Sequence, residues 1–311
     1  RRHRRAHPPI GHPTGELKAR VRSPYAAPMA VGDRWTIGDV RITSIIESDS
    51  SWKWRWLLPD VDDDLVDEIG WLRPSYAGDG GRFPMRIQGF VVEVRDRRIV
   101  VDTCVGNDKP RNTPLFDRLD ATFLTALDSV CPVEDVETVV CTHLHVDHVG
   151  WNTRRRDGSW VPTFEGARHL FARAEYEHWA EDTDEMSVAV QADSVDPLVH
   201  AGLVDLVEPD HAICDEVTLE ATHGHTPGHV SVRVASRGAS AVITGDMTHH
   251  PIQLTRPGIC SSADVDPAAS TRTRHEAFAR WAEAGTLVIG SHYAQPSAGR
   301  LVEHEGGWRL S

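Results

Sequence analysis

The order of apolar and polar residues along the chain predicts alternating strands and helices from about residue 31 onward. Phe90–Val94 and Ile99–Asp102 are apolar stretches that flank the polar turn Arg95–Arg98, a pattern typical of a β-hairpin. Apolar side chains then recur at helical spacing up to Cys131-Pro132, where we expect the helix to end. The residues with this spacing are Phe116, Leu119, Phe123, Leu124 and Leu127.

Further along the chain, short apolar segments predict more strands and one more helix. Asp266-Pro267 is typical of a helix start, and Ala277, Phe278 and Trp281 form the apolar face of the helix that follows. Strands and helices that alternate in this way indicate an α/β protein whose sheets are covered by helices. The strand segments are Glu137–Cys141, Val217–Ala221, Val230–Val234, Ala241–Ile243 and Leu287–Ile289.

Several side chains that can bind metal come directly after these predicted strands. His143, Asp246 and His292 each follow the end of a buried strand, and His229 lies in a loop between two strands. Strand ends hold side chains at fixed positions, so residues from distant parts of the chain can share one site there.

His143 belongs to a dense cluster with the pattern His-x-His-x-Asp-His. His143 and His145 are two residues apart, so in an extended segment both side chains point the same way and can bind one ion. Asp147 and His148 come where the chain must turn, and they can face a second ion. The alternative is a surface stretch of histidines, but the intervening residues are apolar, which favours the wall of a cleft.

The charge of the chain is distributed unevenly. The formal net charge of the 311 residues is −13, whereas residues 1–22 hold seven Lys or Arg and one Glu, which leaves −19 for the rest. A body this acidic repels phosphate backbones, so nucleic acid is not expected as a partner. We predict a basic, flexible N-terminal segment over residues 1–30, with a partner-binding arm as the alternative, and one domain over residues 31–311.

Cysteines and hydropathy indicate the cellular setting. Five cysteines, an odd number without Cys-x-x-Cys spacing, indicate reduced thiols rather than a disulfide framework. No apolar run approaches the roughly 20 residues that span a bilayer, so no membrane association is expected. The basic start is followed by His, Pro and Gly rather than by the apolar stretch of a signal peptide. We expect a cytoplasmic protein, with secretion as the alternative because the chain does not begin with Met.

These motifs resemble the metallo-β-lactamase superfamily, whose signature is His-x-His-x-Asp-His after a buried strand. Asp102–Cys104 resembles the early Asp-Thr-Gly element of that family, and Thr222–His229 resembles the loop with the third histidine. Thr244–Asp246 resembles the segment with the bridging aspartate, and Gly290–His292 resembles the last ligand. The order and spacing are similar over about residues 31–300. The resemblance implies an αββα sandwich of two sheets with helices outside and the site along one edge.

The resemblance also implies two divalent metal ions. Imidazole and carboxylate ligands favour Zn²⁺, and they also suit Fe, Mn or Co. Asp102 is expected to orient a ligand, and His223 and His225 are expected to shape their loop. The implied ligands are His143, His145 and His229 at the first ion, Asp147, His148 and His292 at the second, and Asp246 between the two.

Two such ions lower the pKa of a bridging water, and the resulting hydroxide attacks a carbonyl or phosphoryl centre. Asp246 stands where the common zinc β-lactamases have Cys, which fits lactonases, thioesterases and phosphotriesterases of the family. The segments 245–253 and 292–300 resemble the methyl parathion hydrolase and quorum-quenching lactonase branch. The resemblance therefore implies a hydrolase that opens a small neutral ester or lactone similar to an acyl-homoserine lactone, with organophosphate triesterase side activity.

Three residues are expected to act in catalysis, namely Asp147, Asp246 and His249. Many acyl-homoserine lactonases have a tyrosine at the position of His249, so the group that protonates or orients the leaving group is open. His250 is the other histidine that could face the cleft.

The substrate is the feature that the sequence defines least. Trp52, Trp54 and Trp56 alternate, which is typical either of a buried edge strand or of an apolar rim that accepts an acyl chain. The alternative functions are a β-lactamase-type amide hydrolase and a mononuclear iron oxygenase similar to persulfide dioxygenases. A small-molecule substrate is the expected partner, and the resemblance allows a homodimer.

Overall fold

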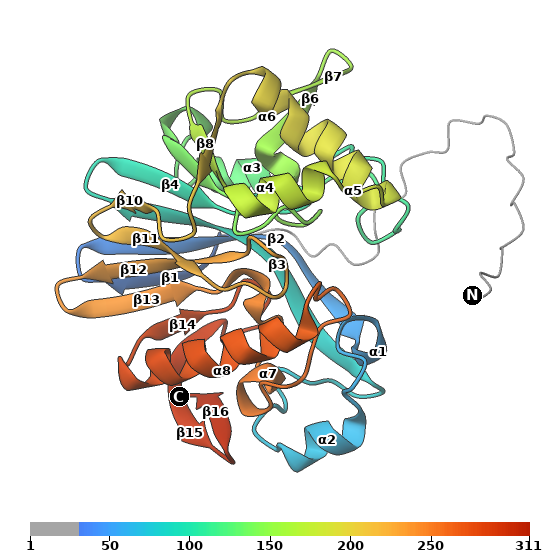
Figure 1. The fold of residues 1–311 in the computed structure, drawn as a ribbon, viewed down its shortest axis with the longest axis vertical. Helices are drawn as coiled ribbons and strands as arrows, with labels where there is room; N and C mark the ends of the chain where they lie inside the picture. The colour runs from blue at the N-terminus through green and yellow to red at the C-terminus, as the bar shows by residue number, and fades with distance from the viewer. Residues whose placement is uncertain (1–30) are drawn as a thin grey trace, which may run out of the picture.

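Two seven-stranded sheets lie face to face, and helices cover their outer faces (Figure 1). The computed structural model describes residues 31–311, so the predicted segment 1–30 lies outside the described residues. The four layers confirm the expected αββα sandwich. Within residues 31–311, no helix is long and apolar enough to cross a membrane.

The first sheet has the strand order β1-β2-β3-β4-β5-β8-β9. Strands β1 to β4 pair antiparallel, whereas β4, β5, β8 and β9 pair parallel. A separate two-stranded ribbon is formed by β6 (Thr153–Arg156) and β7 (Ser159–Pro162). The strands of the sheet are β1 (Val31–Ile37), β2 (Val40–Lys53), β3 (Arg82–Val94), β4 (Arg97–Val101), β5 (Thr138–Val140), β8 (Arg168–Ala172) and β9 (Val204–Val207).

The second sheet has the order β10-β11-β12-β13-β14-β15-β16. Strands β13 and β14 pair parallel, and the other neighbours pair antiparallel. Its strands are β10 (Ala212–Cys214), β11 (Val217–Ala221), β12 (Val230–Ser236), β13 (Ala239–Ile243), β14 (Leu287–Ile289), β15 (Ala298–His304) and β16 (Gly307–Leu310).

The helices form the two outer layers, and short helical turns occupy the loops (Figure 1). Beside the first sheet lie α3 (Phe123–Asp128), α4 (Arg173–Ala180), α5 (Glu185–Val190) and α6 (Asp196–His200). Beside the second lie α1 (Trp54–Leu57), α2 (Asp63–Glu68), α7 (Ile252–Thr255) and α8 (Pro267–Glu283). The turns are the 3-10 helices η1 (Val133–Asp135), η2 (Gly150–Asn152) and η4 (Gly245–Met247) and the π-helix η3 (Gln191–Val195).

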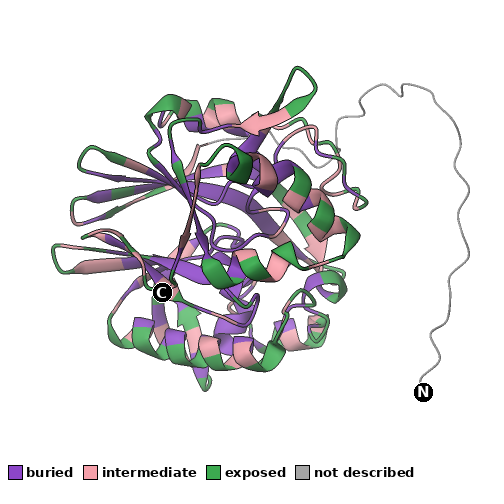
Figure 2. Cartoon of the chain, turned by 45° about the horizontal axis from the view of Figure 1, so that its top comes forward, coloured by how far each residue is buried: buried purple, intermediate pink, exposed green. Residues whose placement is uncertain are grey.

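Burial is greatest between the layers, and the outer helix surfaces are exposed (Figure 2). Most residues between the two sheets are aliphatic, as Val92 on β3 and Val232 on β12 illustrate. On the second sheet's outer face, Phe278 and Trp281 of α8 pack against Val288 and its neighbours. A strand that is covered on both faces needs apolar side chains at nearly every position. Short apolar segments of the sequence therefore predicted these strands.

One predicted helix and one predicted strand differ from the structure. The helix expected from Phe116 begins only at Phe123, because Asn107 Nδ2 donates to Ala121 O at 2.8 Å and its Oδ1 accepts from Ala121 N at 2.6 Å, which ties the preceding residues into a loop. The three alternating tryptophans do not form one strand. Trp52 lies next to the last residue of β2, whereas α1 begins at Trp54. The Trp54 ring stacks on that of Phe83, with 4.2 Å between the ring centroids.

Candidate metal centre

Strand ends at one edge of the sandwich position the candidate ligands. The first sheet carries Asp102 after β4 and the segment 143–148 after β5. The second sheet carries Asp246 after β13, within η4, and His292 after β14. Since β4/β5 and β13/β14 are parallel pairs, the carboxyl ends of the strands in each pair lie at the same edge.

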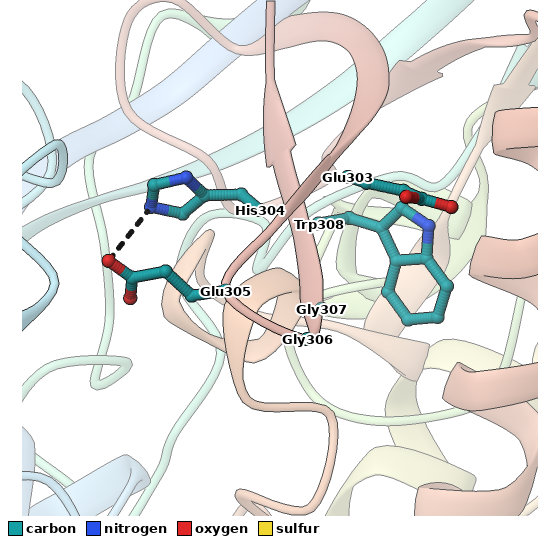
Figure 3. A pocket seen from close by; sticks show the side chains of 6 residues that line it. All are labelled: Glu303, His304, Glu305, Gly306, Gly307 and Trp308. Carbon is teal, nitrogen blue, oxygen red and sulfur yellow. Dashed lines mark ion pairs between the residues drawn. The ribbon is translucent and has the colours of Figure 1, made fainter.

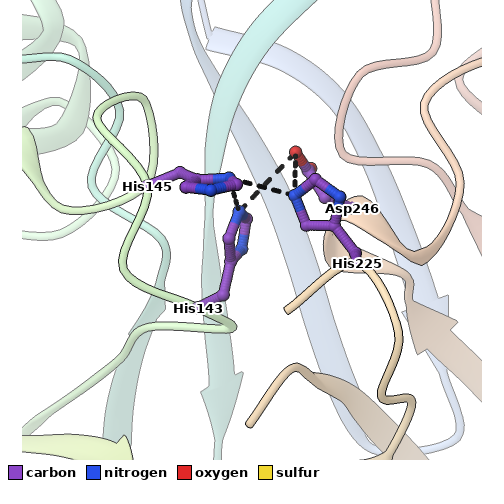
Figure 4. A group of neighbouring side chains, drawn as sticks. All are labelled: His143, His145, His225 and Asp246. Atoms are coloured by element: carbon purple, nitrogen blue, oxygen red, sulfur yellow. Dashed lines mark hydrogen bonds and ion pairs between the residues drawn. The ribbon is translucent and has the colours of Figure 1, made fainter. Parts of the chain in front are cut away.

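Four side chains converge in a first ligand group, formed by His143, His145, His225 and Asp246 (Figure 4). His145 Nδ1 lies 3.0 Å from both His143 Nε2 and His225 Nε2. Asp246 Oδ2 lies 3.7 Å from His143 Nε2 and 3.5 Å from His225 Nε2. A tetrahedral zinc ion with bonds of about 2.0–2.1 Å separates its ligand atoms by roughly 3.3 Å, so these spacings fit one such ion.

His225 takes the place in this group that the sequence assigned to His229. The Nδ1 atom of His229 lies 2.9 Å from Thr222 Oγ1, and its Nε2 atom accepts the backbone N–H of Asp246 at 2.8 Å. Both ring nitrogens of His229 are therefore engaged within the protein, whereas His225 Nε2 faces the other members of the group. The interpretation of His229 as the third ligand, and of His225 as a loop residue only, is corrected accordingly.

A second ligand group consists of Asp147, His148 and His292. His148 Nε2 lies 3.2 Å from His292 Nε2. The carboxylate of Asp147 lies 3.8 Å from His148 Nε2 through Oδ1 and 3.7 Å from His292 Nε2 through Oδ2. These are the three side chains that the resemblance assigned to a second ion, and the structure brings them together.

The two oxygens of Asp246 face different groups. Oδ2 faces the first group, and Oδ1 lies 2.9 Å from His292 Nε2 and 3.2 Å from His148 Nε2 in the second. Oδ1 is buried, and it accepts no hydrogen bond from any of the described residues. A buried carboxylate oxygen without a hydrogen bond is costly unless it binds a cation, so the residues present fit a metal ion on each side of Asp246.

Buried polar partners orient the ligands of the second group. Asp102 Oδ2 lies 2.9 Å from His148 Nδ1, and its oxygens also accept the N–H and the hydroxyl of Thr142. His292 Nδ1 lies 2.6 Å from the carbonyl oxygen of Arg86. These contacts leave Nε2 of both histidines directed at the group, which is the usual arrangement behind metal-binding histidines.

Glu175 on α4 connects the two loops of the first group, and the sequence analysis missed it. Its Oε1 accepts from Leu144 N at 3.0 Å and from Trp179 Nε1 at 2.5 Å, and its Oε2 accepts from Gly228 N at 3.0 Å. In the sequence this acid is one of two on a short helix. Its role depends on tertiary packing, so no local pattern indicated it.

The electrostatics of the centre favour bound cations. Burial is the largest influence on His143 and lowers its pKa well below the usual value, which keeps this imidazole neutral as metal binding requires. Burial acts in the same direction on His148, but the carboxylates of Asp246, Asp102 and Asp147 outweigh it and raise the pKa of His148 well above its usual value. These carboxylates would stabilise a divalent ion in the same way.

His249 faces the centre, and His250 does not. His249 is 2% exposed, its Nε2 lies 3.1 Å from Asp246 Oδ2, and its ring lies parallel to that of His292 at 5.8 Å. His250 instead lies 2.7 Å from the carbonyl oxygen of Tyr76 through Nε2 and accepts from Ile252 N through Nδ1. Of the two histidines, only His249 is placed to act on a substrate.

An open hollow lies at the turn between β15 and β16, lined by residues 303–308 (Figure 3). His304 Nε2 and Glu305 Oε1 are 3.8 Å apart in this hollow. Its lining shares no residue with the two ligand groups, so it is separate from the candidate metal centre.

The four-layer sandwich with histidines and aspartates gathered at one sheet edge defines the class of protein. A family model described as "Metallo-beta-lactamase superfamily" matches residues 84–292. Because the match spans more than half of the chain, this protein belongs to that superfamily. No match was found among curated proteins.

Solved structures share the fold over nearly the whole chain. The hydrolase AbOPH of the beta lactamase superfamily is 24% identical with a TM-score of 0.74, and the match covers 92% of this chain and 98% of that one. AidC, a dizinc quorum-quenching lactonase in complex with the product N-hexanoyl-L-homoserine, is 16% identical with a TM-score of 0.76, at 91% and 97% coverage. An N-acyl homoserine lactone hydrolase with N-hexanoyl-L-homoserine at its catalytic metal centre is 17% identical with a TM-score of 0.60, at 83% and 94% coverage. At these sequence identities, the similarity to the solved structures establishes the fold of this chain.

Proposed function

We propose that this protein is a dinuclear metal-dependent hydrolase that opens a small neutral ester or lactone of the acyl-homoserine lactone type. The observation that carries the proposal is the Asp246 carboxylate, whose two oxygens face two separate groups of ligands. Two divalent ions bound there would lower the pKa of a shared water toward neutrality and polarise the carbonyl oxygen of the substrate.

The donor atoms support this assignment. Imidazole nitrogens and carboxylate oxygens suit Zn²⁺, and also Fe, Mn or Co. The similarity to a structure described as a dizinc lactonase with its product supports both the metal and the reaction. The proposed ligands are His143, His145 and His225 in the first group, Asp147, His148 and His292 in the second, and Asp246 in both.

The surroundings of the centre favour a neutral substrate with an apolar part. The Trp179 ring lies 5.1 Å from that of His145 and provides an apolar surface beside the first group. Arg86 forms ion pairs with Asp33 and Asp49, so its charge is already compensated. An acyl or aromatic ester therefore fits this site better than a highly anionic thioester.

The proposed role of His249 is to donate a hydrogen bond to the leaving-group oxygen. In an ester this is the alkoxy oxygen, and in a lactone it is the ring oxygen released on opening. Its ring lies beside the shared carboxylate of Asp246 and parallel to the ring of His292. Its Nδ1 has no hydrogen-bond partner among the described residues. A donor held in a buried site stabilises developing negative charge more strongly than one in water.

A His249→Phe variant is expected to lower kcat by about 10²- to 10³-fold, since it keeps a planar ring and removes the donor. Both metals should remain bound. A His249→Tyr variant restores a donor and should recover part of the rate. Steady-state kinetics on one lactone, with metal content measured on the same samples, test this role. Full activity of the phenylalanine variant contradicts it, and loss of a metal from that variant instead identifies His249 as a ligand.

Metal content and substrate range test the proposed function itself. Elemental analysis should give two equivalents of metal per chain, and a γ-lactone or a p-nitrophenyl ester should be hydrolysed until a chelator removes the metal. A phosphotriester measures the proposed side activity. Faster turnover of a β-lactam would support an amide hydrolase instead. One iron per chain without hydrolysis of any of these four substrates would move the protein to the oxygenases.

A further inference from the structure

Asp264 is a buried carboxylate that lies outside every motif of the centre and contacts His225 directly. Its Oδ1 lies 2.9 Å from His225 Nδ1, and neither side chain is exposed. On the other side of the ring, His225 Nε2 lies 3.0 Å from His145 Nδ1 and 3.5 Å from Asp246 Oδ2. The ring therefore connects Asp264 to the first ligand group.

Backbone contacts place Asp264 beside this histidine. Val265 N donates to His225 O at 2.9 Å, and Asp266 N donates to Gly224 O at 2.9 Å, so the two loops run side by side. Gly224 has a φ of +129°, and a Cβ atom there would lie 2.2 Å from Ser270 N, which restricts this position to glycine. The close approach of the loops thus sets the distance between the carboxylate and the ring.

Arg274 on α8 balances the charge of Asp264. Its side chain is fully buried, and its Nη1 lies 3.5 Å from Asp264 Oδ2. Its hydrogen bonds go to Pro257 O at 2.8 Å, Met247 O at 3.2 Å and Cys260 Sγ at 3.2 Å. A buried guanidinium needs such a carboxylate nearby, and this pairing places the two opposite charges side by side away from solvent.

On this basis, and given the proposed dinuclear centre, we propose that Asp264 is a positioning residue for the first metal. It holds His225 with the proton on Nδ1 and the lone pair of Nε2 directed at the first group, and it makes the ring a stronger ligand. The pair formed by Asp102 and His148 does the same in the second group. Besides the shared Asp246, each group therefore has its own positioning carboxylate, Asp264 for His225 and Asp102 for His148, so the two affinities can be changed separately.

An Asp264→Asn variant tests this inference because it removes the charge and keeps the shape. We expect the affinity for Zn²⁺ at the first group to fall by about 10- to 100-fold, with the second affinity unchanged. The matched control is Asp266→Asn, two residues away. Asp266 Oδ1 accepts from Ala269 N at 2.9 Å at the start of α8, and its side chain is exposed. This control should bind both metals as the wild-type chain does.

The measurement is a titration of each metal-free protein with Zn²⁺ in competition with a chromophoric chelator, and no substrate is needed. The melting temperatures of the metal-free and metal-loaded forms are measured as well, to separate an effect on metal binding from a general loss of stability. An Asp264→Asn variant with both affinities unchanged overturns the inference, as does a variant that melts lower by the same amount in both forms. If this variant does not fold, Asp264→Asn combined with Arg274→Met removes both buried charges and should show the same selective loss.

The outcomes for the two proposals differ. A wild-type chain that binds two Zn²⁺ but hydrolyses none of the test substrates overturns the proposed function and leaves the role of Asp264 standing. A wild-type chain that binds no metal overturns both.

Discussion

An Asp246→Ala variant is expected to lose at least about 10³-fold in kcat/KM on the preferred lactone or ester, which corresponds to about 4 kcal/mol of transition-state stabilisation. The reason is geometric. Both oxygens of this carboxylate face ligand groups, Oδ2 at 3.5 Å from His225 Nε2 and Oδ1 at 2.9 Å from His292 Nε2. In the proposed dinuclear centre, its removal would leave each group one ligand short and would remove the carboxylate that the two groups share.

The fold should survive this change, because the backbone N–H of residue 246 still donates to His229 Nε2. Circular dichroism checks the fold, and elemental analysis should show fewer than two metals per chain. Asp96→Ala, in the exposed turn between β3 and β4, is the matched control and should match the wild type. An Asp246→Ala protein with two metals and more than about a tenth of the wild-type rate would contradict the bridging role.

The sequence predicted the parts of this protein that depend on local pattern. The strand Leu287–Ile289 matched the structure because a strand covered on both faces needs an unbroken apolar run. The resemblance to the superfamily assigned Asp147, His148 and His292 to one ion, and the structure brings these three side chains together. The helix start at Asp266-Pro267 was predicted because a side-chain cap and a proline act within one turn.

The parts that were missed depend on contacts between distant segments. Glu175 and Asp264 are ordinary acids in the sequence, and they become part of the site only because α4 and the loop before α8 pack against the ligand loops. The start of α3 was placed too early because a side-chain hydrogen bond from Asn107, far back in the chain, holds the preceding residues in a loop. No periodicity within one segment contains this information.

The choice between His225 and His229 shows the same limit and leads to the sharpest test of the ligand set. The two histidines are four residues apart in one loop, and spacing alone does not tell which of them turns inward. In the structure the loop turns at Gly224, which places His225 against the first group. The ring of His229 lies behind the ligand group. Gly245 approaches this ring so closely that a Cβ atom on residue 245 would lie 2.6 Å from His229 Nε2.

Alanine variants of these two histidines should therefore fail in different ways. His225→Ala removes a proposed ligand, so its metal content should fall toward one per chain and its kcat/KM by about 10²-fold or more. It also removes the partner of the buried Asp264 Oδ1, so the metal-free protein should melt lower as well. His229→Ala leaves the ligands in place but removes the acceptor for Asp246 N and the partner of Thr222 Oγ1. Thr222 Oγ1 keeps its contact with Ser231 Oγ at 3.0 Å, but Asp246 N becomes a buried donor without its acceptor. Such a group costs about 1–3 kcal/mol, so this variant should melt several degrees lower.

Metal content, activity and melting temperature measured on both variants separate the two roles. The His229→Ala protein should keep two metals and lose only about tenfold in rate, because His229 acts on the metals through the backbone of Asp246. If it is His229→Ala that loses a metal while His225→Ala keeps both, then His229 is the third ligand after all. That result would mean that the loop of residues 222–229 rotates when metal binds, since the ring of His229 would have to give up both of its present hydrogen bonds.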